Sequence, residues 1–371
     1  MKKFLKIVLT IVVVFLICLV LKLNILDFSA FKVEEQRFSN YSGHYFKQLN
    51  VDEKEIYIKI DDAVKSIRKT VFLGMLDSEG LSDKVGKILI AYFYDNPHIY
   101  YLSNRYVVAT SDVKLFEIST LELNYIINTK EEIESKNKQL DSAISEIISS
   151  NITEDMTDYE RELAIHDALV DKVTYYNYEN IEDIPCIKHT AYGALVENEA
   201  VCDGYSKAFK LLLEKVGIDN VIIHGSTEDV AHAWNVVSLD GEYYHVDTTS
   251  DKLDMTKKYV IHTYFNLTDK QIFETHSINQ DFIVPQCNSE RYNYYNKQGY
   301  TILNQDNLYN KLDVIITKQK KSKILEIKLD NKYTVKRLID TLYDLDFNNW
   351  RSNRENSVEY TQVQDKYIFV K

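Results

Sequence analysis

Apolar side chains recur at helical spacing in the segment that begins at position 205. The positions on this face are Tyr205, Ala208, Phe209, Leu212 and Val216. This i, i+3, i+4, i+7 repeat predicts an amphipathic helix, and Gly217 is typical of the residue just after a helix end. Cys202 then lies at the N-terminus of the helix, where Asp203 and Gly204 suit a tight turn.

Two β-rich segments with alternating polarity follow, and Asp240-Gly241 joins them. The first ends at Leu239 and the second is Glu242-Tyr-Tyr-His-Val-Asp247. Asp-Gly between such segments predicts a β-hairpin with a two-residue turn, which sets Leu239 opposite Glu242. Asp247 and His232 then become diagonal neighbours on one face. Diagonal Cβ atoms are about 7 Å apart, so the carboxylate and the imidazole can meet.

The remaining patterns predict an α+β chain in three folded parts. Helical repeats occupy residues 53–73, 82–94, 129–150, 303–316 and 334–343. Strand patterns lie near residue 106 and over residues 121–127, 324–329, 359–363 and 367–370. From these patterns we expect an N-terminal segment (1–30), an N-terminal α+β domain (31–128), a central domain (129–290) and a small C-terminal α+β domain (291–371).

The N-terminal segment has the composition of a membrane-targeting sequence. It begins Met-Lys-Lys-Phe-Leu-Lys and is uncharged over residues 7–21. Snorkelling of Lys6 and Lys22 extends the usable apolar stretch to residues 4–26, which is long enough for one span. The basic N-terminus predicts a single-pass anchor with the chain after residue 30 outside the cytoplasm. A cleaved signal and a secreted protein are the alternative, although no small-x-small cleavage site follows the apolar stretch.

Cys202, His232 and Asp247 together supply the three side chains that a thiol acyl-transfer site needs. A helix N-terminus stabilises an anion, so it favours the thiolate form of Cys202 and suits the binding of an oxyanion. A carboxylate at Asp247 would fix the tautomer of His232 and stabilise its cation. The other ring nitrogen is then free to exchange a proton with the thiol.

Three segments resemble the catalytic blocks of the transglutaminase-like superfamily, in its bacterial extracytoplasmic branch. They are Ala200-Val-Cys-Asp-Gly-Tyr-Ser-Lys-Ala-Phe, His232-Ala-Trp-Asn and Tyr243-Tyr-His-Val-Asp-Thr-Thr. The resemblance covers about residues 157–270. It implies a papain-like α+β core, in which the helix of the nucleophile Cys202 packs against an antiparallel sheet with the base His232 and the orienting acid Asp247. Ser250 is a departure, because many relatives have Trp there.

Two further side chains are candidates for a part in this site. Tyr192 is a candidate to lend its hydroxyl to the oxyanion hole beside the Cys202 backbone N–H. His245 is on the same hairpin face as Asp247 and is a candidate to support the site or contact the substrate. For both residues the alternative is plain packing in the core.

Cysteine and histidine usage gives no sign of a disulfide framework or a metal centre. Cys186, Cys202 and Cys287 follow the N-terminal segment, and whether Cys186 and Cys287 pair stays open. The nine His are scattered, with neither CxxC nor HExxH spacing. Glycine loops of the kinds that bind cofactors are also absent. We therefore expect no metal and no cofactor.

The acidic charge is concentrated in the middle of the chain. The net charge is −12, and residues 1–31 and 300–371 carry +3 each, so residues 32–299 hold −18. Such a surface disfavours nucleic acid and bare anionic membrane as partners.

The sequence thus predicts a membrane-anchored extracytoplasmic cysteine enzyme, either an acyltransferase or a protease or amidase. It would act on amide bonds of peptides or proteins through a thioester. Cell-wall peptides and surface proteins are candidate substrates. The alternative is a catalytically inactive transglutaminase-like module for binding or assembly at the surface.

Overall fold

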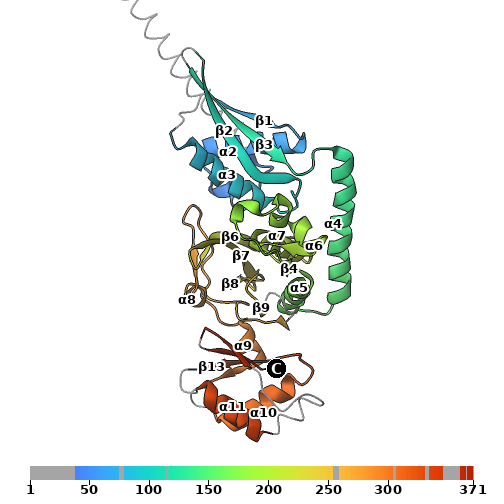
Figure 1. The fold of residues 1–371 in the computed structure, drawn as a ribbon, viewed down its shortest axis with the longest axis vertical. Helices are drawn as coiled ribbons and strands as arrows, with labels where there is room; N and C mark the ends of the chain where they lie inside the picture. Colours follow the sequence, from blue (N-terminus) through green and yellow to red (C-terminus); the bar gives the residue numbers. More distant parts are fainter. Residues whose placement is uncertain are drawn as a thin grey trace, which may run out of the picture.

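The chain folds into a mixed α+β structure whose three parts follow one another along the long axis (Figure 1). This computed structural model describes residues 38–74, 79–113, 116–253, 259–303, 306–330, 334–345, 360–364 and 366–370. Within these ranges, no helix has both the length and the apolar character needed to cross a membrane. The predicted membrane segment, residues 4–26, lies outside the described residues.

The N-terminal part packs two helices against a three-stranded antiparallel sheet. The helices are α2 (Val51–Lys65) and α3 (Leu81–Asp95), after the short η1 (Phe46–Gln48). The strands, in sheet order, are β1 (Thr70–Gly74), β3 (Phe116–Tyr125) and β2 (Leu102–Val113). The predicted helix over 53–73 is therefore too long. The chain leaves the helix at Ser66, Ile67 adopts a left-handed φ of 55°, and β1 follows.

The helix α4 (Lys130–Asn151) runs beside the N-terminal and central parts, close to its predicted range (Figure 1). Its buried side chains recur at helical spacing: Ile133, Leu140, Ile144 and Ile147. They belong to the same hydrophobic core as the helices of the central part. The helix therefore braces the central part through one apolar stripe.

The central part packs helices on a four-stranded antiparallel sheet. The strands, in sheet order, are β11 (His276–Ile278), β6 (Asn220–Thr227), β7 (Val230–Leu239) and β8 (Glu242–Val246). The helices are α5 (Asp158–Lys172), α6 (Ala191–Leu195), α7 (Cys202–Lys215) and α8 (Asp269–Ile272), with η2 (Ile181–Asp183) and η3 (Cys186–His189) between α5 and α6. Two short pairs complete it: β4 (Thr174–Tyr175) with β5 (Glu199–Ala200), and β9 (Lys252–Leu253) with β10 (Tyr259–Val260).

The β7–β8 hairpin has the predicted register. Leu239 pairs with Glu242, and the last pair is Asn235 with Val246. Asp240 and Gly241 both have positive φ, 50° and 80°, as a type I′ turn requires. Asp247 consequently leaves the hairpin directly after its last paired residue.

The N-terminal core continues onto the central sheet. Ile222 of β6 and Ala233 of β7 belong to the same buried cluster as the apolar side chains of α2 and α3. The Tyr45 hydroxyl also donates a hydrogen bond to the backbone carbonyl of Ile222. Because Ala233 is the neighbour of His232 in the sequence, this packing holds the N-terminal part next to the candidate site.

The C-terminal part is a small α+β unit with its own core. Its helices are α9 (Tyr294–Gln298), α10 (Leu308–Lys318) and α11 (Val335–Asp344). Its strands, in sheet order, are β12 (Thr301–Ile302), β13 (Leu325–Leu329), β15 (Tyr367–Val370) and β14 (Tyr360–Val363). The helix predicted from residue 303 begins five residues later, because Asn307 caps it by accepting a hydrogen bond from the Asn310 N–H.

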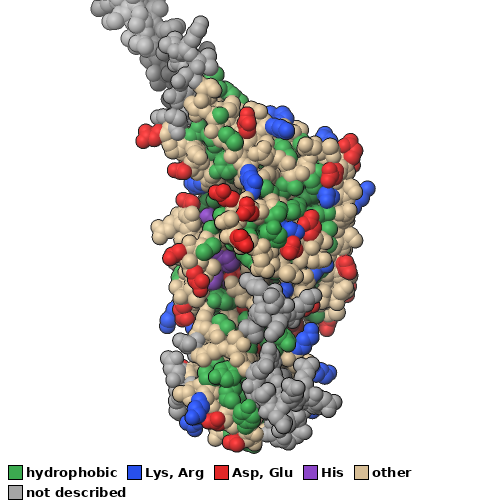
Figure 2. All heavy atoms as spheres, viewed as in Figure 1, with side chains coloured by type: hydrophobic (Ala, Val, Ile, Leu, Met, Phe, Trp, Pro, Cys, Tyr) green, Lys and Arg blue, Asp and Glu red, His purple; other side chains and the backbone are tan. Residues whose placement is uncertain are grey.

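Acidic and basic side chains are interspersed over the face of the molecule in Figure 2. On the described part of that face, histidine side chains reach the surface in the central part. On the described part of this face, the basic side chains are scattered and form no extended stripe.

Gly225 gives a direct test of the sheet packing. A Cβ added at Gly225 on β6 would lie 1.9 Å from the Ser277 backbone oxygen and 2.7 Å from the Trp234 ring. We expect Gly225→Ala to lower the free energy of unfolding by about 1–3 kcal/mol, measured by urea denaturation. The control is Gly86→Ala on α3, where the added Cβ meets only the Tyr106 hydroxyl at 3.0 Å. Equal midpoints for the two variants would contradict this packing.

Candidate active site

Cys202 is the first residue of α7, and its thiol is free and partly exposed. The N–H groups of the first helical turn have no acceptor within the helix, so they give this end a partial positive charge. Gly204 lets the helix start pack closely, since an added Cβ would lie 2.7 Å from both the Ala200 Cβ and the Lys188 carbonyl oxygen. The position of the thiol is thus fixed by backbone packing.

His232 on β7 connects the thiol to Asp247. Its Nε2 lies 2.8 Å from Asp247 Oδ2, and both side chains are buried. Cys202 and His232 line the same cavity, and because Nε2 is engaged by Asp247, Nδ1 is the ring nitrogen left for the thiol. The structure therefore brings thiol, imidazole and carboxylate together in that order, as the hairpin register predicts.

The electrostatics favour a charged His232. Burial alone would lower the pKa of His232, but the Asp247 carboxylate and, after it, the neighbouring Cys202 side chain raise it to about 11. Burial likewise acts to raise the pKa of Asp247, but His232 and His276 hold it well below its usual range. An imidazolium next to the thiol stabilises a thiolate at neutral pH.

The carboxylate of Asp247 has four hydrogen-bond partners. Oδ2 accepts from His232 and from His276 Nε2 on β11, at 2.8 and 3.1 Å. Oδ1 accepts from the backbone N–H groups of Thr249 and Ser250, at 3.0 and 3.3 Å. His276 was not found from the sequence, because it lies 29 residues after Asp247 on a three-residue strand with no motif around it. Ser250 contributes only its backbone N–H here, a group that every residue except proline has.

His245 lies behind the site and not in it. Trp234 Nε1 donates to His245 Nδ1 at 3.0 Å, so Nδ1 is an acceptor and the proton is on Nε2, which donates to Asp269 at 2.9 Å. The Trp234 ring in turn stacks near His232, with centroids 6.0 Å apart and an interplanar angle of 20°. His245 therefore orients Trp234, which agrees with support of the site but not with contact with a substrate.

Tyr192 does not reach the thiol. Its hydroxyl donates to Gln139 on α4 and accepts from Lys136 at 3.3 Å, and its ring packs on Tyr100. Of the two alternatives given for Tyr192, these contacts agree with packing in the core and not with the oxyanion role. Tyr175 is one of the tyrosines that line the cavity around Cys202. Burial first, and then the Cys202 side chain, raise the pKa of Tyr175, so its hydroxyl keeps its proton as a donor.

The thiol opens into a cavity of about 290 Å³. Its walls come from both the N-terminal and the central part and are largely apolar or aromatic: Leu89, Ile90, Phe93, Tyr94, Tyr106, Tyr175, Tyr178, Ile181 and Ile184. A larger polar hollow of about 670 Å³ near His44 and Asp95 contains none of the three catalytic candidates. We place the site at the smaller cavity, because Cys202 and His232 line it.

One partly buried carboxylate lies beside the nucleophile. Asp203 accepts hydrogen bonds from the Tyr94 hydroxyl at 3.0 Å and from His189 Nδ1 at 3.2 Å. Burial acts to raise the pKa of Asp203, but Lys207 and His189 hold it below its usual range. Since Tyr94 belongs to α3, this contact also fastens the N-terminal part to the start of α7.

The other cysteines do not pair with each other. Cys186 and Cys287 are both free. Cys186 Sγ accepts a hydrogen bond from Ser103 at 3.2 Å, whereas Cys287 packs in the core around Trp234. Since both thiols are free, the structure has no disulfide bridge between Cys186 and Cys287.

In the described part of the chain, three clusters have side chains that could hold a metal ion. Two surround the site just described: His232 with Asp247 and His276, and His245 with Asp269 and Cys287. In the first, both ring nitrogens that face Asp247 bind one carboxylate oxygen. The third cluster is separate and is analysed below.

Residues 146–248 match the family model of the transglutaminase-like superfamily. The chain contains a transglutaminase-like domain. The match begins within α4 and ends just after Asp247, so it includes Cys202 and His232. The superfamily includes cysteine proteases and acyltransferases.

Solved structures are similar to this chain only at low identity. One, described as a TGase, is 16% identical over 47% of this chain and 48% of that chain, with a TM-score of 0.28. A protein from Cytophaga hutchinsonii, described as a candidate cysteine protease, is 12% identical over 39% and 62%, with a TM-score of 0.24. The chain thus spans less than two thirds of either structure. No curated protein matches it.

Alkylation of Cys202 tests the thiol–imidazole pair. Because the pKa of His232 is raised to about 11, its ring stays charged over the neutral range and loses its proton only at strongly alkaline pH. We expect iodoacetamide to label Cys202 faster in the wild type than in His232→Ala at neutral pH, because a charged ring beside the thiol favours the reactive thiolate. The labelling rate is followed by mass spectrometry.

Labelling of the partly exposed Cys186 in the same samples provides the internal control. Equal labelling rates at Cys202 in the two proteins would contradict the thiol–imidazole pair.

Proposed function

We propose that the chain is a membrane-anchored extracytoplasmic cysteine enzyme that acts on amide bonds of peptides or proteins. The observation that carries this proposal is His232, which lies between the thiol of Cys202 and the buried carboxylate of Asp247. The cavity in front of the thiol supplies room for an acyl group. Burying an ion pair costs desolvation free energy that packed apolar side chains would not cost. A buried pair beside a thiol therefore favours a chemical role over a purely structural one.

In the proposed reaction, the Cys202 thiolate attacks the amide carbonyl carbon and forms a C–S bond. The carbonyl oxygen becomes an oxyanion, for which the Cys202 backbone N–H and the Tyr175 hydroxyl are candidate donors. His232 gives its Nδ1 proton to the amide nitrogen, the C–N bond breaks and the amine leaves. Asp247 stabilises the imidazolium throughout and keeps Nε2 protonated.

The thioester that remains is resolved by a second nucleophile. Water gives a free carboxylic acid, and a primary amine gives a new amide; in both cases neutral His232 takes the proton of the attacking group and the thiolate leaves. The same three residues serve both reactions, so the geometry of the site does not distinguish hydrolysis from acyl transfer. The product analysis below separates the two.

The cavity walls restrict the acyl donor. Phe93 and Tyr94 from the N-terminal part and Tyr178 from the central part face the thiol across an apolar surface. A donor with an aromatic or branched apolar side chain near the reacting amide would cover more of this surface than a charged one. Peptides of the cell wall and surface proteins outside the cytoplasm are candidate sources of such amides.

Product analysis with a peptide library tests the reaction. The full chain in detergent is incubated with amide-bearing peptides, with and without an added primary amine, and the products are read by mass spectrometry. We expect Cys202→Ala to lose activity on the order of 10⁴-fold or more, because the nucleophile is gone. Cys186→Ala removes a free thiol elsewhere and should keep full activity.

A wild type as inactive as Cys202→Ala on every peptide would favour the inactive binding module instead. Incorporation of the amine would assign acyl transfer, and its absence from cleaved products would assign hydrolysis.

The anchor has its own test. Because residues 4–26 are apolar and flanked by lysines, we expect the chain expressed in a bacterium to stay in the membrane fraction after a carbonate wash. Its N-terminal residue should precede the apolar segment. A matched chain that replaces residues 1–30 with a cleavable signal should appear in the soluble exported fraction. Release of the wild-type chain into the medium, beginning near residue 30, would contradict the anchor.

A further inference from the structure

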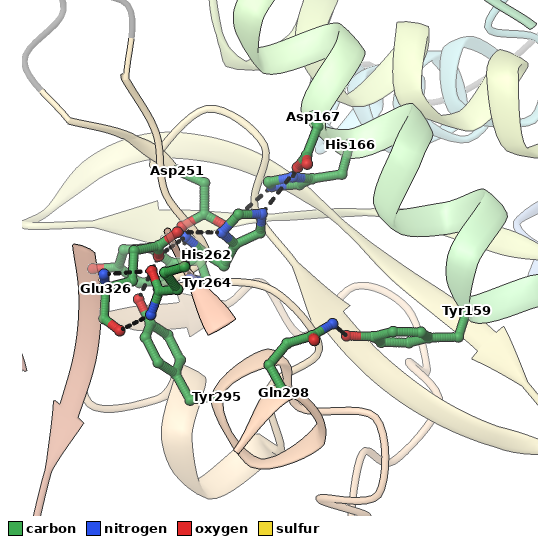
Figure 3. A network of polar contacts seen from close by, with 10 residues as sticks. Tyr159, His166, Asp167, Asp251, His262, Tyr264, Tyr295, Gln298 and Glu326 are labelled. Atoms are coloured by element: carbon green, nitrogen blue, oxygen red, sulfur yellow. Dashed lines mark hydrogen bonds and ion pairs between the residues drawn. The ribbon is translucent and has the colours of Figure 1, made fainter. Parts of the chain in front are cut away.

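A second polar centre lies where α5 meets the segment after β10 and the C-terminal sheet (Figure 3). Two imidazoles and three carboxylates alternate along it, in the order Asp251, His166, Asp167, His262 and Glu326. The reaction proposed above uses none of these groups. We therefore asked what the arrangement of their atoms could bind.

The inner nitrogens of both rings converge on one oxygen. His166 Nδ1 lies 3.0 Å from Asp167 Oδ1, and His262 Nε2 lies 2.9 Å from the same atom. All three atoms lie within 4.8 Å of one another. Two ligand atoms bonded at about 2.1 Å to one tetrahedral ion are about 3.4 Å apart. The two nitrogen–oxygen distances are close to this spacing.

The outer nitrogens of the rings are held by buried carboxylates. His166 Nε2 lies 3.1 Å from Asp251 Oδ2, and neither side chain is exposed. His262 Nδ1 lies 2.9 Å from Glu326 Oε1, and these side chains are 7% and 6% exposed. A carboxylate on the far nitrogen is the usual companion of a metal-binding histidine, because it fixes the tautomer and directs the other lone pair toward the ion.

The rings are also fixed in place by aromatic neighbours. His262 stacks on Tyr294 with centroids 3.7 Å apart and an interplanar angle of 9°. His166 packs edge-on against Phe265, with centroids 4.9 Å apart. Preorganised ligands lose little freedom when an ion binds. The Asp167 side chain, in contrast, is 45% exposed, so an ion and its water ligands can enter from solvent.

We propose that His166, Asp167 and His262 form a binding site for one divalent transition-metal ion of the zinc class. Two imidazole nitrogens and one carboxylate oxygen suit Zn²⁺, Co²⁺ or Mn²⁺ better than they suit Mg²⁺ and Ca²⁺, which prefer ligand sets made of oxygen atoms alone. Three protein ligands leave at least one position for water.

The site joins parts of the chain that matter for the catalytic candidates. Glu326 belongs to β13, so an ion here would fasten the C-terminal part to α5. Asp251 also accepts a hydrogen bond from the Tyr264 N–H at 2.8 Å, and the Tyr264 carbonyl accepts one from the Asp247 N–H at 3.1 Å. A bound ion would therefore steady the loop that carries Asp247, without contact with the thiol.

Metal titration of the full chain tests the proposal. The chain carries Cys202→Ala, which removes the thiolate as a competing ligand, and is stripped with EDTA and dialysed in detergent. Co²⁺ is added and its visible absorption recorded, and metal per chain is measured after desalting. We expect one Co²⁺ per chain, displaced by one Zn²⁺ and unaffected by equal Mg²⁺.

Two aspartates on α5 give a matched pair of variants. Asp167→Asn replaces a proposed ligand, and Asp158→Asn replaces a carboxylate of similar exposure, 47% against 45%, that pairs with Arg161. Asp167→Asn should weaken Co²⁺ binding about 100-fold or more, and Asp158→Asn should leave it unchanged. Glu326→Gln keeps all three ligands and should weaken binding about 10-fold.

Thermal melts without metal compare the folding of the variants, and added Zn²⁺ should raise the melting temperature of the parent but not that of Asp167→Asn. The absence of stoichiometric binding would overturn the proposal. Metal binding that stays intact in both Asp167→Asn and Glu326→Gln would also overturn it. Metal binding that only His276→Gln removes would overturn it too, because the ion would then lie at the catalytic candidates.

Discussion

The buried carboxylate of Asp247 is the constraint on which the rest of the site depends. A fully buried carboxylate is stable only if its oxygens are satisfied, and here two imidazoles and two backbone N–H groups satisfy them. The hairpin register brings His232 to it, and β11 must pair with β6 to bring His276. The charge of Asp247 then raises the pKa of His232, which in turn holds a proton next to Cys202.

The second constraint is the contact between the N-terminal part and the central sheet. The cavity in front of Cys202 has walls from both, and the Tyr94 hydroxyl binds Asp203 at the start of α7. Ile222 and Ala233 extend the N-terminal core onto the two central strands. The thiol chemistry thus comes from the transglutaminase-like domain, while the space for an acyl group comes partly from the domain before it.

Sequence patterns predicted the features that depend on local spacing. The Asp240-Gly241 turn fixed the register, and the apolar repeat after Tyr205 placed Cys202 at a helix start. His276 and the pair His166 and His262 could not be found in this way, because loops and sheet order bring them together over 29 and 96 positions. The choice between the two alternatives for Tyr192 needed the structure for the same reason: its nearness to Cys202 in the sequence says nothing of α4, which takes its hydroxyl.

The central claim is that Asp247 keeps His232 protonated beside the thiol, and ¹⁵N NMR of the His232 ring measures it most directly. The account predicts an imidazolium that persists far above the ordinary pKa of 6.5, toward about 11, with Nε2 always protonated. In Asp247→Asn the titration should fall back by several pH units. A wild-type ring that titrates near 6.5, unchanged by Asp247→Asn, would contradict the account.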